Sequence, residues 1–424
     1  MRLHPLAPIL TTLLVVLLAP ACTPAVHSPR WAQVSEHTPA ALLQADAHDP
    51  SLAAAADGRI ALTWVTSDTA GSDVWLAVSS DSGGHFAPPV RVNAVHGEVT
   101  SYSESRPVVA FGSGAHVIVA WASRRAGLTG ADDIVARMSE DGGAHFGPPV
   151  ALNSDAHDPR STYHGFLALA TNPAGEAAVA WIDGRSAAMA PGEDEPGRSE
   201  IRIAVSRDGG AAWARDTLVA REVCSCCRLG LQFGDAGRVA VAYRGARDDL
   251  RDPRLAQSFD DAVTFTRDTL ISADHWRLNA CPSVGPAIAG QGEGGIYAWY
   301  TGSDSTSDGA PPGVYVKALA PGGGAGPRHS VADSLRSASR PVLASAGAGA
   351  MLGVIAVPRA DSTRHVLAVR ALDARALPGP WLFLGAGVRS AALASAGPRQ
   401  TWAAWVEKLA MGPRVRLARI TALP

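Results

Sequence analysis

A short apolar strand pattern that ends in a large side chain returns along the chain at a nearly regular spacing. Its first copy reads Ala61-Leu-Thr-Trp64, and successive copies lie 48 to 62 residues apart. A period of this size is typical of repeat architectures, in which each repeat forms one small structural unit. The copies end at Trp64, Trp121, Trp181, Tyr243, Trp299, Val357 and Trp405.

Each repeat unit predicts four strands with tight turns between them. In the first unit the strands are expected over 49–54, 59–64, 74–78 and 90–93, with turns rich in Asp, Ser and Gly. Four antiparallel strands joined by short connections form one blade of a β-propeller. Units two to six begin near Arg106, His164, Cys227, Cys281 and Arg340.

The last unit, which begins at Val388, contains only three strand patterns, and the segment over 31–35 can supply the fourth. Such a closure leaves no free edge strand, which is a liability in a sheet. We therefore predict an all-β propeller of four-stranded blades, closed by the N-terminal strand. Seven blades are favoured, and six are the alternative. No long linker interrupts the repeats, so residues 45–424 are predicted to form one domain after an N-terminal segment over 22–44.

The turn between the third and fourth strands carries a second repeated signature. It reads Ser79-x-Asp81-x-Gly83-x-x-Phe86 in the first unit. Ser and Asp oxygens accept backbone N–H groups in such turns, and glycine adopts a positive φ without strain. This pattern resembles the Asp-box, or bacterial neuraminidase repeat, of the sialidase superfamily. Its aspartates are Asp81, Asp141, Asp208 and, in a degraded copy, Asp260.

The resemblance covers about residues 45–420 and implies a sialidase-like propeller in which the Asp-box aspartates are structural. It also implies an active site with three arginines that clamp the substrate carboxylate. The other members of that site are a tyrosine nucleophile assisted by a glutamate, and an aspartate that acts as acid and base. Arginine suits the clamp because its planar fork matches a carboxylate in bidentate fashion.

Strand direction gathers the starts of the first strands at one end of the central channel, and the Asp-box turns at the other end. Carried over by position, the resemblance makes Arg106, Arg228 and Arg340 the substrate-binding candidates. The catalytic candidates are Asp49, Glu104 and Tyr163.

Two family features are missing from the sequence. The Arg-Ile-Pro motif of the first blade is replaced by His48-Asp49-Pro50, and no tyrosine follows Tyr315 to act as a late nucleophile. The sequence therefore leaves two hypotheses about function open. One is an exo-alpha-sialidase-like glycoside hydrolase, or a degenerate relative that binds acidic glycans. The other is a non-catalytic envelope lipoprotein that binds a soft metal or a protein partner.

The second hypothesis depends on a cysteine cluster at the same end of the channel. Cys224-x-Cys226-Cys227 begins the fourth unit and Cys281 begins the fifth. Disulfides are expected in an exported protein, and four cysteines allow three pairings. The alternatives are a redox-active pair and a thiolate site for Cu or Zn, with His275 as an added ligand. With Trp-x-x-Asn-Ala-Cys-Pro, the Cys-x-Cys-Cys motif resembles a bacterial exported subgroup of sialidase-like proteins.

The first residues of the chain predict export. The apolar run over 9–18 is too short to span a membrane, and Leu18-Ala-Pro-Ala-Cys22 follows it. This arrangement resembles a bacterial lipoprotein signal, in which residues 1–21 are removed and Cys22 is lipidated. Secretory cleavage after Ala21 is the alternative. We therefore expect a protein of the periplasm, the outer membrane or the cell surface that touches the membrane only through a lipid anchor.

The formal net charge of −2 provides no global field that would attract nucleic acid. We expect a monomer without nucleic-acid partners, and an acidic glycan or an envelope protein as the ligand.

Overall fold

The computed structural model describes residues 31–423. Within that range 44–45, 103, 157, 159–161, 189–198, 266, 291–293, 303–310, 322–323, 332, 360–362 and 411 are not described. The predicted signal over 1–21 and the predicted lipidation site Cys22 lie outside the described residues. The described chain is nearly all-β, with strands β1 to β29, two 3-10 turns at η1 (Ala40–Leu42) and η2 (Arg247–Asp249), and one α-helix, α1 (Arg185–Ala188). Among these residues no helix is long and apolar enough to cross a bilayer.

Four sheets consist of four strands that follow one another along the chain, each paired antiparallel with the next. The first contains β11 (His164–Thr171), β12 (Ala177–Asp183), β13 (Ser199–Ser206) and β14 (Thr217–Val223). The second contains β15 (Gly230–Phe233), β16 (Val239–Arg244), β17 (Pro253–Ser258) and β18 (Arg267–Leu270). The third contains β19 (Ala287–Ala289), β20 (Gly295–Thr301), β21 (Gly313–Leu319) and β22 (His329–Ser330). The fourth contains β23 (Leu335–Ala346), β24 (Gly349–Pro358), β25 (Val366–Leu372) and β26 (Leu382–Leu384).

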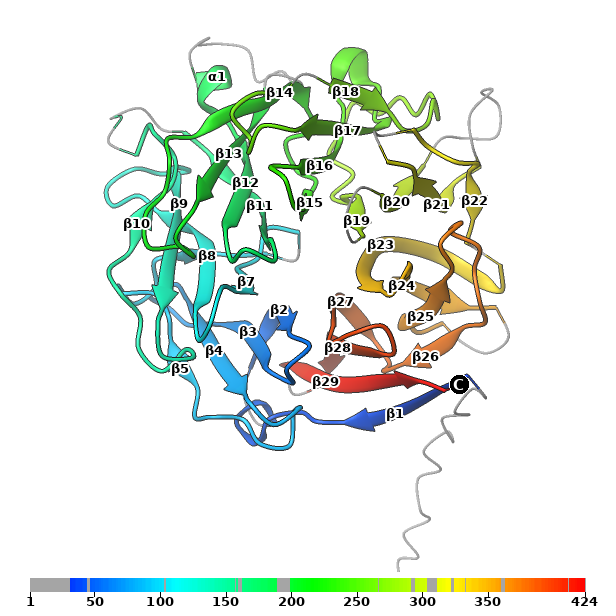
Figure 1. Ribbon diagram of the computed structural model, residues 1–424, viewed down its shortest axis with the longest axis horizontal. Coiled ribbons are helices and arrows are strands. Elements are labelled where there is room, and N and C mark those ends of the chain that lie inside the picture. The colour runs from blue at the N-terminus through cyan, green and yellow to red at the C-terminus, as the bar shows by residue number, and fades with distance from the viewer. Residues whose placement is uncertain are drawn as a thin grey trace, which may run out of the picture.

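A fifth four-stranded sheet combines the two ends of the described chain in the order β1-β29-β28-β27. Its strands are β27 (Val388–Ser395), β28 (Gln400–Leu409), β29 (Gly412–Ala422) and β1 (Ala32–Glu36). Ala32 pairs with Ala422 and Glu36 with Ala418, and β1 lies beside β29 in Figure 1. The segment over 31–35 thus supplies the outer strand of this sheet.

The remaining strands form one nine-stranded sheet, where the sequence predicts two separate units. The two-residue strand β6 pairs with both β4 and β8, because Val99 lies opposite both Ser72 and Ser123. It thereby joins two groups of four consecutive strands. The first group is β2 (His48–Ala54), β3 (Ile60–Ser67), β4 (Ser72–Ser79) and β5 (Val90–Arg91). The bridge β6 is Val99–Thr100, and the second group is β7 (Val108–Phe111), β8 (Val117–Arg124), β9 (Asp132–Ser139) and β10 (Val150–Ala151).

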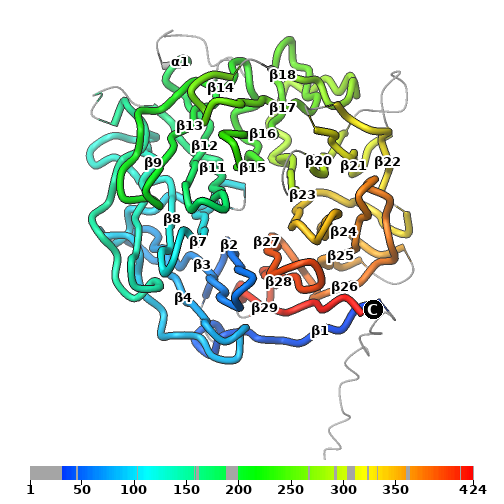
Figure 2. Tube along the Cα trace, viewed as in Figure 1, coloured from blue at the N-terminus to red at the C-terminus, as the bar shows by residue number. Residues whose placement is uncertain are grey.

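These groups of strands follow one another around a central axis in a propeller-like arrangement (Figures 1 and 2). The second strand of a group is packed on both faces, which explains why it reads as a continuous apolar run in the sequence. All seven residues of β12 are buried, for example. Trp121, Trp181 and Trp299 of the repeated pattern are fully buried, and burial of such a side chain contributes about 1.5–3 kcal/mol to folding.

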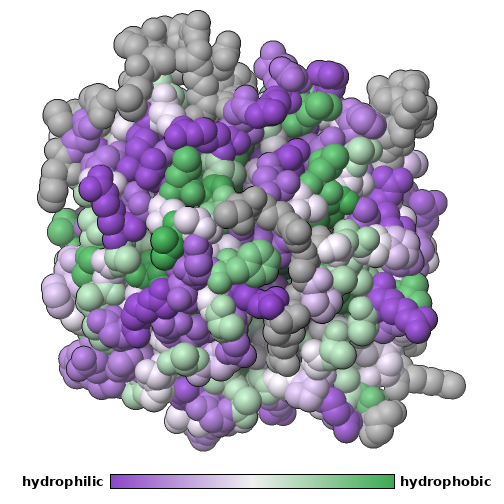
Figure 3. Space-filling model, turned by 45° about the horizontal axis from the view of Figure 1, so that its top comes forward, coloured by the Kyte–Doolittle hydropathy of each residue, from purple (hydrophilic) through white to green (hydrophobic). Residues whose placement is uncertain are grey.

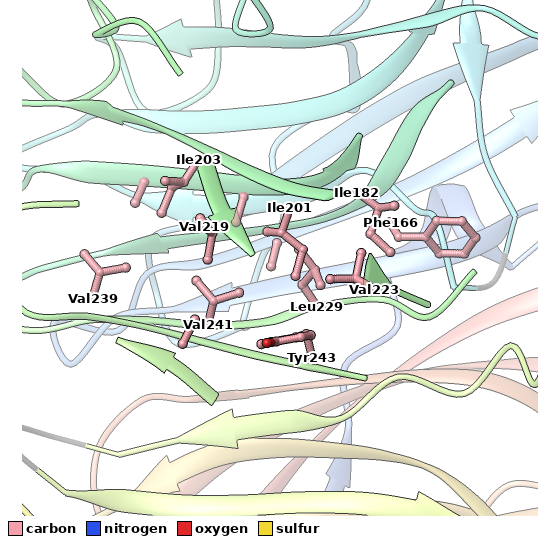
Figure 4. Packing of buried hydrophobic residues seen from close by; sticks show 14 of the residues in the cluster. Phe166, Ile182, Ile201, Ile203, Val219, Val223, Leu229, Val239, Val241 and Tyr243 are labelled. Atoms are coloured by element: carbon pink, nitrogen blue, oxygen red, sulfur yellow. The ribbon is translucent and has the colours of Figure 1, made fainter. Parts of the chain in front are cut away.

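The layer between β13 and β16 shows how neighbouring sheets are held together. Ile201 and Ile203 of β13 pack near Val241 and Tyr243 of β16, and Leu229 lies between the two sheets (Figure 4). These side chains belong to one buried cluster. On the outside, hydrophilic residues are interspersed with small hydrophobic patches over the face seen in Figure 3.

The four repeated turns share one hydrogen-bond pattern. In the first, the Ser79 hydroxyl donates to Asp81 Oδ1 over 2.8 Å and accepts the N–H of Gly83 over 2.9 Å. The N–H of His85 donates to the same carboxylate oxygen, and these contacts lower the pKa of Asp81. The equivalent contacts recur at Asp141, Asp208 and Asp260. Each of these aspartates thus accepts hydrogen bonds within its own turn.

Candidate functional site at the mouth of the central channel

A cavity of about 190 Å³ lies on the central axis, and the innermost strand of every group of strands lines it. Most of the residues that line it have apolar side chains, Leu52, Leu167 and Leu343 among them, although polar atoms make up the larger part of its exposed surface. The charged residues that line it are Glu104, Arg106 and Arg228. All three precede an innermost strand, so the charge of the channel is concentrated where those strands begin. We call this end of the channel, with Arg340 and Asp49, the mouth.

Glu104 and Arg228 form the buried part of the mouth. Arg228 Nη1 lies 3.6 Å from Glu104 Oε1, and Arg228 Nη2 donates to the carbonyl of Pro341. Glu104 Oε2 accepts the N–H of Gly285 over 3.1 Å. A Cβ at Gly285 would lie 2.1 Å from the Arg228 carbonyl oxygen, so this close approach requires glycine. Glu104 is thereby fixed as a partner of Arg228.

Arg106 lies within electrostatic range of the other charged residues predicted for the site. Its Nη1 donates to the Ala391 carbonyl over 2.8 Å. Burial, followed by repulsion from Arg228, lowers the pKa of Arg106 to about 10, and Arg340 adds to this effect. The carboxylates of Glu104 and Asp49 act in the opposite direction. Arg106 thus has both other predicted arginines and both predicted catalytic carboxylates within electrostatic range.

Arg340 and Asp49 reach the mouth through irregularities in the innermost strands. The register of β23 shifts between Ser339 and Val342, and that of β2 shifts between His48 and Ser51. Within these shifts Arg340 has a φ of 52° and Asp49 a φ of 48°. A bulge re-aims a side chain that regular pairing would direct elsewhere. Sequence reasoning missed these bulges, because a non-glycine residue with positive φ leaves no composition signal.

Asp49 belongs to a hydrogen-bonded chain at the edge of the mouth. Its Oδ2 accepts the Ser101 hydroxyl over 2.8 Å and lies 3.0 Å from His48 Nδ1. His48 Nε2 lies 3.0 Å from the hydroxyl oxygen of Ser67, which is exposed. The carboxylate therefore orients the imidazole, and the chain connects the mouth to solvent. Ser67 was not among the residues that the sequence singled out.

Tyr163, the predicted nucleophile, pairs with another tyrosine. Its hydroxyl oxygen lies 3.1 Å from that of Tyr102, and both rings pack edge-on against Phe166. Burial raises the pKa of Tyr163 well above its usual value, and Tyr102 and Asp132 add to the effect. A raised pKa keeps the hydroxyl protonated and opposes nucleophilic attack. Glu104 is not among the described contacts of Tyr163, so the catalytic role of Tyr163 stays a prediction.

The cysteines converge as the sequence predicts, and one pairing is formed. Cys226 and Cys281 make a disulfide, while Cys224 and Cys227 are buried thiols whose Sγ atoms lie 3.2 Å apart. The hydrogen bond from Cys227 and the charge of Arg244 lower the pKa of Cys224, against the effect of burial. Burial raises the pKa of Cys227.

With the Cys226–Cys281 disulfide formed, the predicted Cu or Zn ligands cannot all bind one metal ion as thiolates. Of the four cysteines among the described residues, Cys224 and Cys227 retain thiols. His275 is exposed and lines a different cavity of about 270 Å³ with Tyr243 and Asp252. The metal site therefore stays a prediction for the fully reduced protein.

A second buried charge cluster lies on β11 and β12. His164 Nδ1 lies 2.6 Å from the Asp132 carbonyl oxygen, and His164 Nε2 lies 3.2 Å from Asp155 and from Asp183. Arg185 Nη2 fills the space beside these carboxylates, 2.8 Å from Asp183 Oδ2. Two cations thus already neutralise this acidic group, and we assign it a structural role.

Comparison with known proteins supports the fold. No protein-family model matches the sequence. No curated protein matches it either. Among solved structures, the polysaccharide lyase Uly1 matches with a TM-score of 0.54 and 11% identity, over 89% of this chain and 90% of that chain. A PL25 ulvan lyase bound to a chain of GlcA and Rha3S matches with a TM-score of 0.52 and 12% identity, over 88% and 94%.

A leech intramolecular trans-sialidase matches less well, with a TM-score of 0.47 and 11% identity over 86% of this chain and 83% of that chain. The three neighbours named above are glycan-acting enzymes, and the two lyases, whose TM-scores exceed 0.5, show a shared fold at these identities.

Proposed function

We propose that this protein is a carbohydrate-active, sialidase-like propeller that binds an acidic sugar at the mouth through Arg106, Arg228 and Arg340. The observation that carries the proposal is that Arg106 and Arg228 line the same central cavity, at the end where the innermost strands begin. Burial and then repulsion from Arg228 and Arg340 lower the pKa of Arg106 to about 10, which agrees with an excess of positive charge there. Two carboxylates, Glu104 and Asp49, offset part of this charge. A bound carboxylate would offset the remainder and accept bidentate hydrogen bonds.

The shape of the mouth supports a small acidic group rather than a long polymer in the channel itself. The cavity below the charged residues measures about 190 Å³ and is lined mainly by apolar side chains. A cavity of this size has room for a small acidic group beside Arg106 and Arg228. The catalytic roles of Asp49, Glu104 and Tyr163 stay predictions, and the binding proposal does not depend on them.

Calorimetric titration with N-acetylneuraminic acid and with glucuronic acid tests the proposal, with glucose as the neutral reference. We expect the acids to bind and glucose not to bind. Arg106→Ala and Arg340→Ala are each expected to weaken binding about 10- to 100-fold, because a charge-assisted hydrogen bond is lost. Arg399→Ala is the matched control, since Arg399 is exposed and donates to the Ala422 carbonyl from the turn after β27, whereas Arg106 and Arg340 contact the beginning of β27.

Equal affinity for glucose and glucuronic acid, or acid binding that survives Arg106→Ala, would contradict the proposal. Turnover is measured separately. Release of a fluorogenic aglycone from a sialoside reports hydrolysis, and formation of an unsaturated uronate reports elimination.

We further propose that the ring is a seven-bladed propeller closed by β1. Each of seven groups of strands contributes its innermost strand to the central cavity, and β1 completes the group of β27 to β29. Pairing of β1 with β29 then leaves the last group with four strands like the others.

Export as a lipoprotein remains our proposal for location, with Cys22 as the lipidated residue. The Cys226–Cys281 disulfide supports an oxidising compartment, because disulfides are rare in the cytosol. We expect the protein to fractionate with membranes and Cys22→Ser to fractionate with soluble protein. A wild-type protein recovered entirely in the soluble fraction would favour plain secretory cleavage.

A further inference from the structure

Four sulfur atoms form a short series that runs from the surface into the interior. Cys281 is exposed and bonded to Cys226. Cys226 Sγ lies 3.8 Å from Cys224 Sγ, which lies 3.2 Å from Cys227 Sγ. Cys224 and Cys227 are 4% and 2% exposed, so only the outer end of the series meets solvent. Each sulfur is within reach of the next one.

The surroundings of the inner pair are positively charged. Arg244 and Arg251 are 2% and 1% exposed, and both act electrostatically on Cys224. Arg244 donates to the carbonyls of Val284 and Tyr300. Its Nε has no hydrogen-bond partner among the described residues, and neither do Nε and Nη1 of Arg251. The ion pair of Arg251 with Asp249 spans 3.6 Å. Buried guanidinium groups of this kind stabilise a thiolate and oppose a metal cation.

We propose that the four cysteines form a thiol–disulfide relay, in which Cys226 passes one disulfide between the exposed Cys281 and the buried pair Cys224–Cys227. The substrates of such a relay are external thiols and disulfides that exchange with Cys281. This site is separate from the glycan-binding proposal, because it uses none of the arginines assigned to the sugar.

The exchange balances without an external oxidant. The Cys224 thiolate attacks Cys226 Sγ, the Cys224–Cys226 bond forms, and the Cys226–Cys281 bond breaks. The electron pair leaves with Cys281, which takes a proton from solvent. Cys227 then loses its proton and attacks Cys224 Sγ, so that Cys226 leaves as a thiolate and is protonated.

The products of these two steps are the Cys224–Cys227 disulfide and the thiols of Cys226 and Cys281. One disulfide and two thiols exist before and after, and two electrons have moved from the inner pair to the outer pair. An external disulfide can then reoxidise the outer pair by exchange at Cys281, and an external dithiol can reduce it.

The first test maps the pairing in full-length protein held in glutathione buffers of graded ratio. Acid stops the exchange, free thiols are alkylated, and digestion without reduction identifies each disulfide by mass spectrometry. We expect protein with a single disulfide to contain both the Cys226–Cys281 and the Cys224–Cys227 forms. Cys227→Ser should lose the inner form and keep the outer one. Cys281→Ser should keep the inner form.

The second test traps the external partner. Cys226→Ser removes the thiol that resolves a mixed disulfide at Cys281, so glutathione should accumulate on Cys281 in this variant and not in wild type. Circular dichroism verifies that the variants fold. If a variant does not fold, the disulfide map of the wild-type protein alone decides whether the inner disulfide forms.

Two outcomes would overturn the relay. If Cys226–Cys281 is the sole disulfide at every glutathione ratio, this disulfide is purely structural and the thiols of Cys224 and Cys227 do not exchange with it. Zinc or copper bound in equimolar amount, with all four cysteines reduced, would make the cluster a metal site.

Discussion

His164 is fully buried and lies between two carboxylates. These surroundings determine whether its imidazole is charged in the folded protein. Its Nε2 is 3.2 Å from Asp155 and Asp183, at ion-pair distance although without the alignment of a hydrogen bond. Burial by itself lowers the pKa of His164, but the two carboxylates outweigh burial and raise it to about 9. The imidazolium is therefore the form that belongs to the folded protein near neutral pH.

This residue predicts a loss of stability in alkali. Because the pKa in the folded state lies above the unfolded value of 6.5, the stabilisation is complete below about pH 6.5 and is lost as pH rises through about 9. We expect the free energy of unfolding in urea to fall by about 1–3 kcal/mol between these limits through this group. His164→Gln should remove that part of the slope.

The matched control for His164 is His85→Gln. His85 also contacts an aspartate, Asp81, but its side chain is 93% exposed, so its replacement should leave the alkaline slope as in wild type. If both variants show the wild-type slope, His164 is not charged in the folded protein.

At the scale of elements, the repeated turns fasten neighbouring sheets together. Gly83 has a φ of +79°, and a Cβ at this position would lie 2.2 Å from the ring of Trp402 on β28. The third turn has the same relation to the preceding sheet, because a Cβ at Gly210 would lie 3.0 Å from Ile118 on β8. Glycine at this position therefore allows both the left-handed backbone of the turn and the close packing of the turn against the preceding sheet.

Gly83→Ala should reveal both contributions. A left-handed conformation is strained for alanine, and the methyl group would also press against Trp402, so we expect unfolding free energy to fall by about 2–4 kcal/mol. Gly142→Ala is the control, since its φ of +77° is nearly the same and open space surrounds its Cβ position. Its expected loss is about 1–2 kcal/mol. Equal losses would mean that the contact with Trp402 relaxes freely.

The strands could be predicted from the sequence because burial on both faces enforces long apolar runs such as β8 and β12. The turns could be predicted because their Ser, Asp and Gly act within a few residues of one another. The bulges at Asp49 and Arg340 could not, since their backbone torsions carry no glycine signal. The bridge β6 and the Cys226–Cys281 pairing also escaped prediction, because each depends on distances between neighbouring sheets. Arg106, Arg228 and Arg340 were chosen from strand direction together with the resemblance to sialidases, because both place these residues at the starts of innermost strands.

At the scale of the whole molecule, one pairing joins distant parts of the chain, because β1 pairs with β29. The N–H of His37 donates to the Leu417 carbonyl over 2.9 Å. Because N–H groups alternate in direction along a strand, those of Ser35 and Gln33 also face β29, and that of Glu36 faces away. Gln33 and Glu36 are both exposed side chains.

Proline replacement at alternate positions measures how much the β1–β29 pairing contributes to the free energy of unfolding. Gln33→Pro removes a ladder hydrogen bond and should lower the free energy of unfolding by about 1–3 kcal/mol. Glu36→Pro, the control, removes an N–H that faces solvent and should change stability little. Thermal unfolding followed by circular dichroism compares the two. Equal melting temperatures would show that the β1–β29 pairing contributes little to the ring.

The same pairing places a demand on the chain during its synthesis. Ala32 and Ala422 are partners, so at 5–20 residues per second β1 leaves the ribosome about 20–80 s before the end of β29 exists. Throughout that interval β1 has no native neighbour to pair with. Its length of five residues and its exposed Gln33 and Glu36 make it a poor template for foreign strands, and keep it available until its partner is made.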